Sequence, residues 1–158
     1  MKRAAGPDSW KRVPFSTGIR LPYQTKLDEN QFQQIQFGHI PEVMEDKWFV
    51  YYETPHLFFH RSWTGLPVYR LTLDEEQGGS STVVEALLST ERANQVEVDI
   101  QYEARLLDFL LYAVVLHEMK EFPLPDGVES WSKERLLHLQ GHISGTAFPE
   151  SHPKSKKD

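Results

Sequence analysis

Cationic and aromatic side chains are concentrated at two places in this sequence. Lys47 and Trp48 form the first group, and His60, Arg61 and Trp63 form the second. An arginine guanidinium stacks on an indole ring and binds an anionic group through two parallel hydrogen bonds, and a lysine adds a second positive charge. This combination suits a nucleotide or another phosphorylated ligand. We therefore predict that these five residues bind such a ligand.

The same residues also have a structural and a catalytic interpretation. In the structural one, the tryptophans cover the hydrophobic core, and Arg61 stacks on a ring or forms an ion pair with Glu45 or Glu53. In the catalytic one, His60 is the general base of a small hydrolase and Glu53 orients it. A concave pocket lined by Arg61 and Trp63 would favour binding or catalysis over the structural role.

Familiar motifs for cofactors and metals are missing from the sequence. It contains neither of the two glycine-rich phosphate-binding patterns, the Walker motif and GxGxxG, and it contains no GxSxG nucleophile elbow. It contains no cysteine, which excludes disulfides, cysteine-ligated zinc and a cysteine nucleophile. His138 and His142 would share a helix face, but Gly141 lies between them and no HExxH glutamate accompanies them. We therefore expect no metal site and no cofactor.

Consecutive β-type runs would position the cationic and aromatic residues. The runs are rich in β-branched and aromatic residues and span residues 48–53, 56–61, 68–73 and 82–88, although the last would also suit a helix. The short Thr54-Pro55 connection makes the first two runs antiparallel, so their far ends meet. Lys47 and Trp48 should then lie beside residues 60–63. The sequence predicts an antiparallel meander of about four to five strands.

A long helix should pack on one face of this sheet. Residues 101–120 place leucines and valines at helical spacing, and the prolines at 123 and 125 end the pattern. A shorter helix is expected at residues 131–140. Residues 31–37 are expected to form a strand, because apolar residues alternate there with glutamines. Strands followed by helices indicate an α+β fold.

One contiguous core and one folded domain follow from this assignment. The domain should span residues 31–145, after an irregular N-terminal segment at residues 1–30, in which residues 15–23 could be extended. A disordered tail should follow at residues 146–158. The residues expected to share the core are Phe49, Tyr51, Leu57, Phe59, Leu71, Leu107, Leu110, Leu111 and Val114.

The composition narrows the class of partner. The chain has 158 residues, 23 of them acidic and 17 basic, with a net charge of −6. This balance argues against general nucleic-acid binding, which needs basic residues for the phosphates. It also fits a protein-interaction role, such as an immunity or antitoxin-like protein that covers a basic partner. The sequence shows no secretory signal and no apolar run long enough for a membrane span, so we expect a cytoplasmic protein.

Residues 44–71 resemble an uncharacterised bacterial domain with the signature KWFxYYE…LFFHRSWTG. The resemblance covers roughly residues 40–120, and its most specific part is the string from His60 to Gly65. The domain occurs alone or beside ADP-ribosylglycohydrolase-like domains and has no established activity. The resemblance implies a shared fold and favours ADP-ribose or a related nucleotide as the ligand. Together with the residue types, it suggests a non-enzymatic binding or accessory module.

Overall fold

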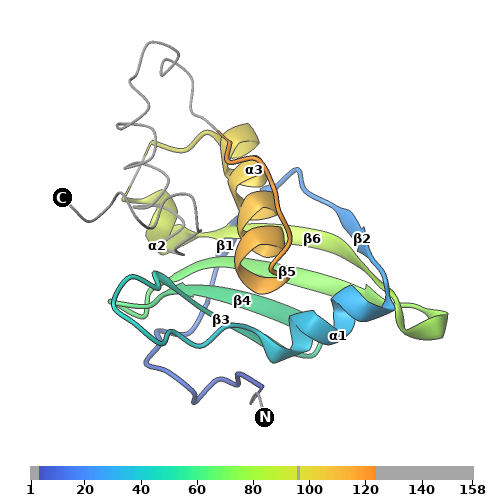
Figure 1. Ribbon diagram of the computed structural model, residues 1–158. Coiled ribbons are helices and arrows are strands. Elements are labelled where there is room, and N and C mark those ends of the chain that lie inside the picture. The colour runs from blue at the N-terminus through green and yellow to red at the C-terminus, as the bar shows by residue number, and fades with distance from the viewer. Residues whose placement is uncertain (1–3, 96, 124–158) are drawn as a thin grey trace.

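The computed structural model of the protein describes residues 4–95 and 97–123. Its centre is a 6-stranded antiparallel sheet. The strands are β1 (Gly18–Leu21), β2 (Thr25–Leu27), β3 (Trp48–Glu53), β4 (His56–Arg61), β5 (Pro67–Glu75) and β6 (Ser81–Ser89). They lie in the order β1-β6-β5-β4-β3, and β2 also pairs with β6 (Figure 1). A sheet with helices packed on it agrees with the predicted α+β class.

The predicted meander is confirmed. β3 pairs with β4 so that Trp48 lies opposite Arg61 and Glu53 lies opposite His56. β4 then pairs with β5, and β5 with β6, all antiparallel. β1 and β2 add to the free edge of β6. β1 lies within residues 15–23, which could be extended according to the sequence, whereas β2 lies in a part of the N-terminal segment that was expected to be irregular. β2 is too short to show the alternation by which a strand is recognised in a sequence.

The strand predicted at residues 31–37 is wrong, because helix α1 (Glu29–Phe37) occupies this region. Asp28 caps it: its carboxylate accepts a hydrogen bond from the Gln31 backbone N–H at 2.8 Å, and the Gln31 side chain accepts one from the Asp28 N–H at 2.9 Å. This reciprocal capping box fixes the start of a helix. The buried residues Phe32 and Ile35 are spaced for one helix face, whereas Phe37 is 37% exposed.

The long helix is shorter than the predicted range of 101–120. Helix α3 (Ile100–Leu110) begins at Asp99, whose side chain accepts hydrogen bonds from two backbone N–H groups of the first turn. A π-helical turn, η2 (Leu111–Val115), continues it. The helix ends there because His117 adopts a left-handed conformation, with φ of 58°. The helix expected at 131–140 and the tail at 146–158 lie outside the described residues.

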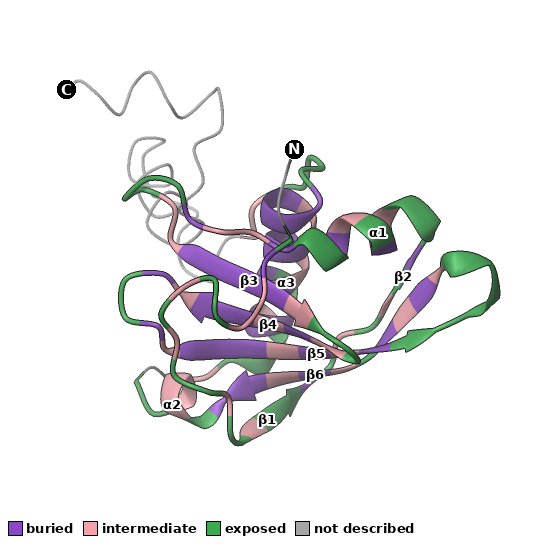
Figure 2. Ribbon diagram, turned by 90° about the horizontal axis from the view of Figure 1, so that it is seen from below, coloured by how far each residue is buried: buried purple, intermediate pink, exposed green. Residues whose placement is uncertain are grey.

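The predicted core is divided between the two faces of the sheet. Leu57, Phe59, Leu71 and the four predicted α3 and η2 residues do share the main cluster, under α3. Phe49 and Tyr51 instead belong to a second cluster on the opposite face, together with Ala5. Successive residues of a strand point to opposite faces, so Trp48 and Val50 face α3 while Phe49 and Tyr51 face away. Figure 2 shows β3 buried along most of its length.

The N-terminal segment covers this second face. The Trp10 indole N–H donates to the Ser62 carbonyl at 2.7 Å. The Val13 N–H donates to the Gly65 carbonyl at 2.7 Å, and the Ala5 N–H donates to the Phe37 carbonyl at 2.8 Å. These bonds join residues 5–13 to the end of α1 and to the turn after β4, and Ala5 packs against Phe49 and Tyr51 of β3. The segment runs below the sheet in Figure 1. In the described part of the chain, no helix has the length and apolar character to span a membrane.

Candidate functional site

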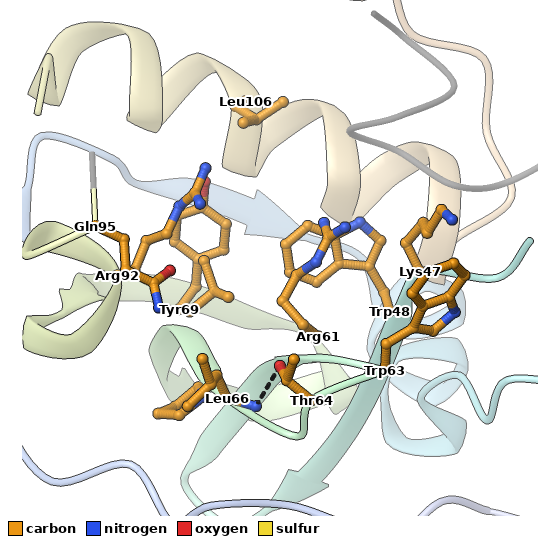
Figure 3. Close-up of a pocket in the computed structure, with 12 residues that line it drawn as sticks. Lys47, Trp48, Arg61, Trp63, Thr64, Leu66, Tyr69, Arg92, Gln95 and Leu106 are labelled. Atoms are coloured by element: carbon orange, nitrogen blue, oxygen red, sulfur yellow. Dashed lines mark hydrogen bonds between the residues drawn. The ribbon is translucent and has the colours of Figure 1, made fainter. Parts of the chain in front are cut away.

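A pocket of about 320 Å³ lies between the far ends of the β3–β4 hairpin and helix α3 (Figure 3). Trp48 lies opposite Arg61, and the Ser62 N–H donates to the Lys47 carbonyl at 2.8 Å. The far ends of the hairpin therefore meet as predicted. The pocket is lined by Lys47, Trp48, Arg61, Trp63, Thr64, Leu66, Pro67, Val68, Tyr69, Arg92, Gln95 and Leu106.

Stacked side chains form the floor of the pocket. The Trp48 ring stacks on the Tyr69 ring, with 6.2 Å between the centroids and 22° between the planes. The Arg61 guanidinium carbon lies 4.8 Å from the Trp48 ring centroid, a cation–π contact. Trp48 is 3% exposed, so it supports Arg61 and does not present an open ring face. Arg61 thus has the stacking role that the structural interpretation allowed, and it also lines the pocket.

The rim of the pocket carries an exposed tryptophan. Trp63 is 56% exposed. Its indole N–H donates to the Met44 carbonyl at 2.9 Å, and the Lys47 ammonium lies 3.9 Å from its ring centroid. The turn that places Trp63 ends at Gly65, whose φ of 77° is in the left-handed region that favours glycine. Trp63 is thus an aromatic ring at the pocket mouth with a cation against it.

Arg92 is a pocket residue that the sequence analysis did not identify. It belongs to the short helix α2 (Thr90–Ala93). Ser89 caps this helix by accepting a hydrogen bond from the Arg92 N–H at 3.0 Å, and its hydroxyl donates to the Pro67 carbonyl at 2.6 Å. The serine before a short charged segment was the available signal for a helix start. Arg92 lies near Arg61 only because β5 pairs with β6, and local sequence patterns do not predict that pairing.

The charge of the pocket is opposite in sign to that of the chain. Its cations are Lys47, Arg61 and Arg92, and none of the described residues that line it is acidic. Burial lowers the pKa of Arg61, and the nearby charge of Arg92 lowers it further. Next to the pocket, the Tyr69 hydroxyl donates to the buried Glu103 carboxylate of α3 at 2.6 Å. The arrangement can bind an anionic group through guanidinium donors and hold a ring at the rim.

His60 does not join the other four predicted ligand-binding residues. It follows the strand alternation and points to the opposite face, where it is fully buried. Its ring stacks with Tyr51 at 5.8 Å, and its Nδ1 lies 3.0 Å from the Gly65 carbonyl oxygen. Burial lowers the pKa of His60. We correct its assignment: His60 is a buried structural residue that packs against Phe49 and Tyr51 of the second core cluster.

The proposed catalytic pair of His60 and Glu53 is not formed. Glu53 lies opposite His56 at the other end of the hairpin. At the usual rise of a strand, this places it about 13 Å from His60. A general base needs an orienting partner within hydrogen-bonding distance and access to substrate. Glu53 is too far away to orient His60, and His60 is fully buried. Among the described residues, no group of three or more acidic or histidine side chains converges as a metal site.

Comparisons of the chain with protein-family models, with curated proteins and with solved structures give no match. The resemblance to the uncharacterised bacterial domain therefore stays a prediction.

Proposed function

We propose that the protein is a non-enzymatic binding or accessory module that holds a nucleotide or an ADP-ribose-like ligand in this pocket. The observation that supports the proposal is the convergence of Lys47, Arg61 and Arg92 around one cavity without an acidic residue among its described lining. The chain as a whole carries a net charge of −6. The pocket therefore has a local positive charge on a protein whose net charge is negative, as expected where an anion is bound.

Each side chain has a distinct role in this proposal. Arg61 donates to a phosphate from a fixed position, because it is supported by the Trp48 ring. Lys47 adds charge at the mouth of the pocket, and Trp63 stacks against the base or another ring of the ligand. Trp48 acts through Arg61 and has no direct contact with the ligand. A cavity of about 320 Å³ is at the small end of the range for ligand pockets, which suits a single nucleotide.

A thermal-shift measurement with ADP-ribose, ADP and AMP tests the proposal. A ligand present at about 100 times its dissociation constant adds about 2.7 kcal/mol to the free energy of unfolding, so the melting temperature should rise. Arg61→Gln and Trp63→Ala should abolish most of the rise. Lys26→Ala is the control, because Lys26 is exposed and pairs with Thr82, at the end of β6 away from α2. It should respond as the wild type does.

Two results would count against the proposal. One is an unchanged melting temperature of the wild type with all three ligands at millimolar concentration. The other is a stabilisation that survives Arg61→Gln in full. If Arg61→Gln lowers the melting temperature strongly without ligand, Lys47→Ala provides the second variant, because the Lys47 ammonium lies at the rim, over the ring of the exposed Trp63.

A second candidate function is protein interaction, and the surface beside the pocket favours it. Val43 and Met44 are strongly exposed apolar residues, and the acidic residues Glu42 and Glu45 flank them. A partner with a basic rim and an apolar centre would match this surface. Under this alternative, Met44→Ser would weaken the complex with such a partner and Arg61→Gln would not. The reverse pattern would exclude it.

A further inference from the structure

Arg61 and Arg92 are directed at two neighbouring positions along the pocket floor. Arg61 lies over Trp48, at 4.8 Å from the ring centroid. Arg92 lies on the Tyr69 side, close enough for its charge to act on the Tyr69 hydroxyl. The two rings stack side by side with centroids 6.2 Å apart. Figure 3 shows the two guanidinium groups above these two rings, with Lys47 beyond Arg61.

Two like charges lie close together at this site. The charge of Arg92 acts on Arg61 in the direction of repulsion. Within residues 4–95 and 97–123, no carboxylate forms an ion pair with Arg92. An anionic ligand that contacts both guanidinium groups would gain two sets of charge-assisted hydrogen bonds.

The backbone holds Arg92 in place for this contact. Ser89 is fully buried; its hydroxyl both caps α2 and donates to the Pro67 carbonyl of β5. The Thr90 N–H also donates to the Thr17 carbonyl at 2.9 Å. A short helix anchored at both of these points positions Arg92 before the ligand arrives, which lowers the entropy lost on binding.

We infer that the ligand carries two linked phosphate groups, one bound by Arg61 and the next by Arg92. This inference rests on the proposed function and adds a ligand class to it, because it distinguishes a diphosphate from a monophosphate. The ring of the ligand would then lie towards Trp63, since Lys47 and Trp63 are on the side of Arg61 that faces away from Arg92 (Figure 3).

Calorimetric titration with AMP, ADP, orthophosphate and pyrophosphate tests the inference on the full chain. We expect the wild type to bind ADP at least tenfold more tightly than AMP, and pyrophosphate more tightly than orthophosphate. A tenfold ratio corresponds to about 1.4 kcal/mol. The two inorganic ions remove the base from the comparison, so the ratio then reports the second phosphate alone.

The variant Arg92→Gln locates the second phosphate. It should weaken ADP binding about tenfold and leave AMP binding within about twofold, so that ADP and AMP bind alike. Arg61→Gln should weaken both nucleotides. Lys26→Ala removes the same charge at a distant site and should weaken neither nucleotide by more than about twofold. The melting temperature of each variant shows whether it is folded.

The outcomes separate this inference from the proposed function. If AMP and ADP bind the wild type equally, or if Arg92→Gln weakens both by the same factor, the diphosphate inference is overturned while nucleotide binding stands. If none of the four probes binds, both are overturned. If ADP is preferred and the preference disappears in Arg92→Gln, the second phosphate lies at Arg92.

Discussion

At the scale of single residues, His60 and Arg61 illustrate how one strand serves two purposes. They are neighbours in β4 but point to opposite faces of the sheet, because side chains alternate along a strand. Arg61 lines the pocket, whereas His60 is buried among the rings of the second core cluster. Its Nε2 has no hydrogen-bond partner within the described residues. A charge on this ring would therefore be poorly solvated.

The first prediction concerns the pH dependence that His60 imposes on stability. Burial lowers the pKa of His60 in the folded protein, while the unfolded chain keeps a value near 6.5. As the pH falls below about 6.5, the unfolded state takes up a proton that the folded state resists. Stability should therefore fall on acidification, by up to about 1.4 kcal/mol per pH unit, until the lowered folded pKa is reached.

Urea unfolding at pH 7.5 and 5.5 measures this effect. His60→Asn keeps an N–H donor for the Gly65 carbonyl and removes the titrating ring, so the difference in stability between the two pH values should shrink relative to the wild type. His56 also has a lowered pKa because of burial, and it is present in both proteins, so its contribution cancels. An equal pH dependence in the two proteins would contradict the burial argument for His60.

A second residue-scale prediction concerns the turn that presents Trp63. Gly65 has a φ of 77°, and an added Cβ would lie 3.0 Å from the Cα of Arg12 in the N-terminal segment. Gly65→Ala should therefore lower the free energy of unfolding by about 1 kcal/mol or more. Gly6→Ala is the matched control, because an added Cβ there meets no atom within 4 Å. Equal effects of the two substitutions would show that the turn tolerates a side chain.

At the scale of elements, α3 supports the pocket from above through Leu106 and seals the main core below. Leu107, Leu110 and Leu111 are completely buried against the sheet. The face that binds the sheet is continuous from α3 into the π-helical turn, where Val114 and Val115 are also buried. The sheet and this helix therefore pack around one core, and the pocket is positioned by both.

The third prediction tests this packing. Leu110→Ala should lower the free energy of unfolding by about 2–5 kcal/mol, because it removes buried methyl groups and leaves a cavity. Ile100→Ala is the control on the same helix, since Ile100 is 41% exposed, and it should change stability by less than about 0.5 kcal/mol. Chemical denaturation of both variants measures the difference. A loss below about 0.5 kcal/mol for Leu110→Ala would mean that another face of α3 is buried.

Elements with strong local signals were predictable from the sequence, and elements fixed by distant contacts were not. The aromatic runs of β3 and β4 and the short turn between them gave the hairpin, and with it the meeting of Trp48 and Arg61. Helix α1 was mistaken for a strand because Ile35 and Phe37 alternate with glutamines, although Asp28 and Gln31 carried the capping signal.

The candidate site was predictable in the same unequal way. Lys47, Trp48, Arg61 and Trp63 could be grouped from the hairpin register alone. The alternation of side chains within β4 already separates His60 from Arg61, but the grouping by residue type ignored it. Arg92 could not be placed, because its position depends on the pairing of β5 with β6 and on the Ser89 contact with Pro67.

At the scale of the whole molecule, each face of the sheet has its own cover. Helix α3 covers one face, and the N-terminal segment covers the other (Figures 1 and 2). The cationic pocket lies beside α3, which contributes Leu106 to its lining. The pocket gathers positive charge on a chain with a net charge of −6. Binding of an anion there should weaken as ionic strength rises, because salt screens the attraction between exposed charges, with a Debye length of about 10 Å at 0.1 M salt.

The proposed binding of an anionic, ring-bearing ligand on the α3 face of the hairpin is tested most directly by the tryptophan indole signals in a proton–nitrogen NMR spectrum. The Trp63 indole N–H lies at the pocket rim, and the Trp10 indole N–H bonds to Ser62 on the opposite face. Trp63→Phe and Trp10→Phe assign the two signals. On titration with ADP, we expect the Trp63 signal to move with a saturable dependence and the Trp10 signal to stay in place. Movement of the Trp10 signal alone, or of neither signal, would contradict the claim.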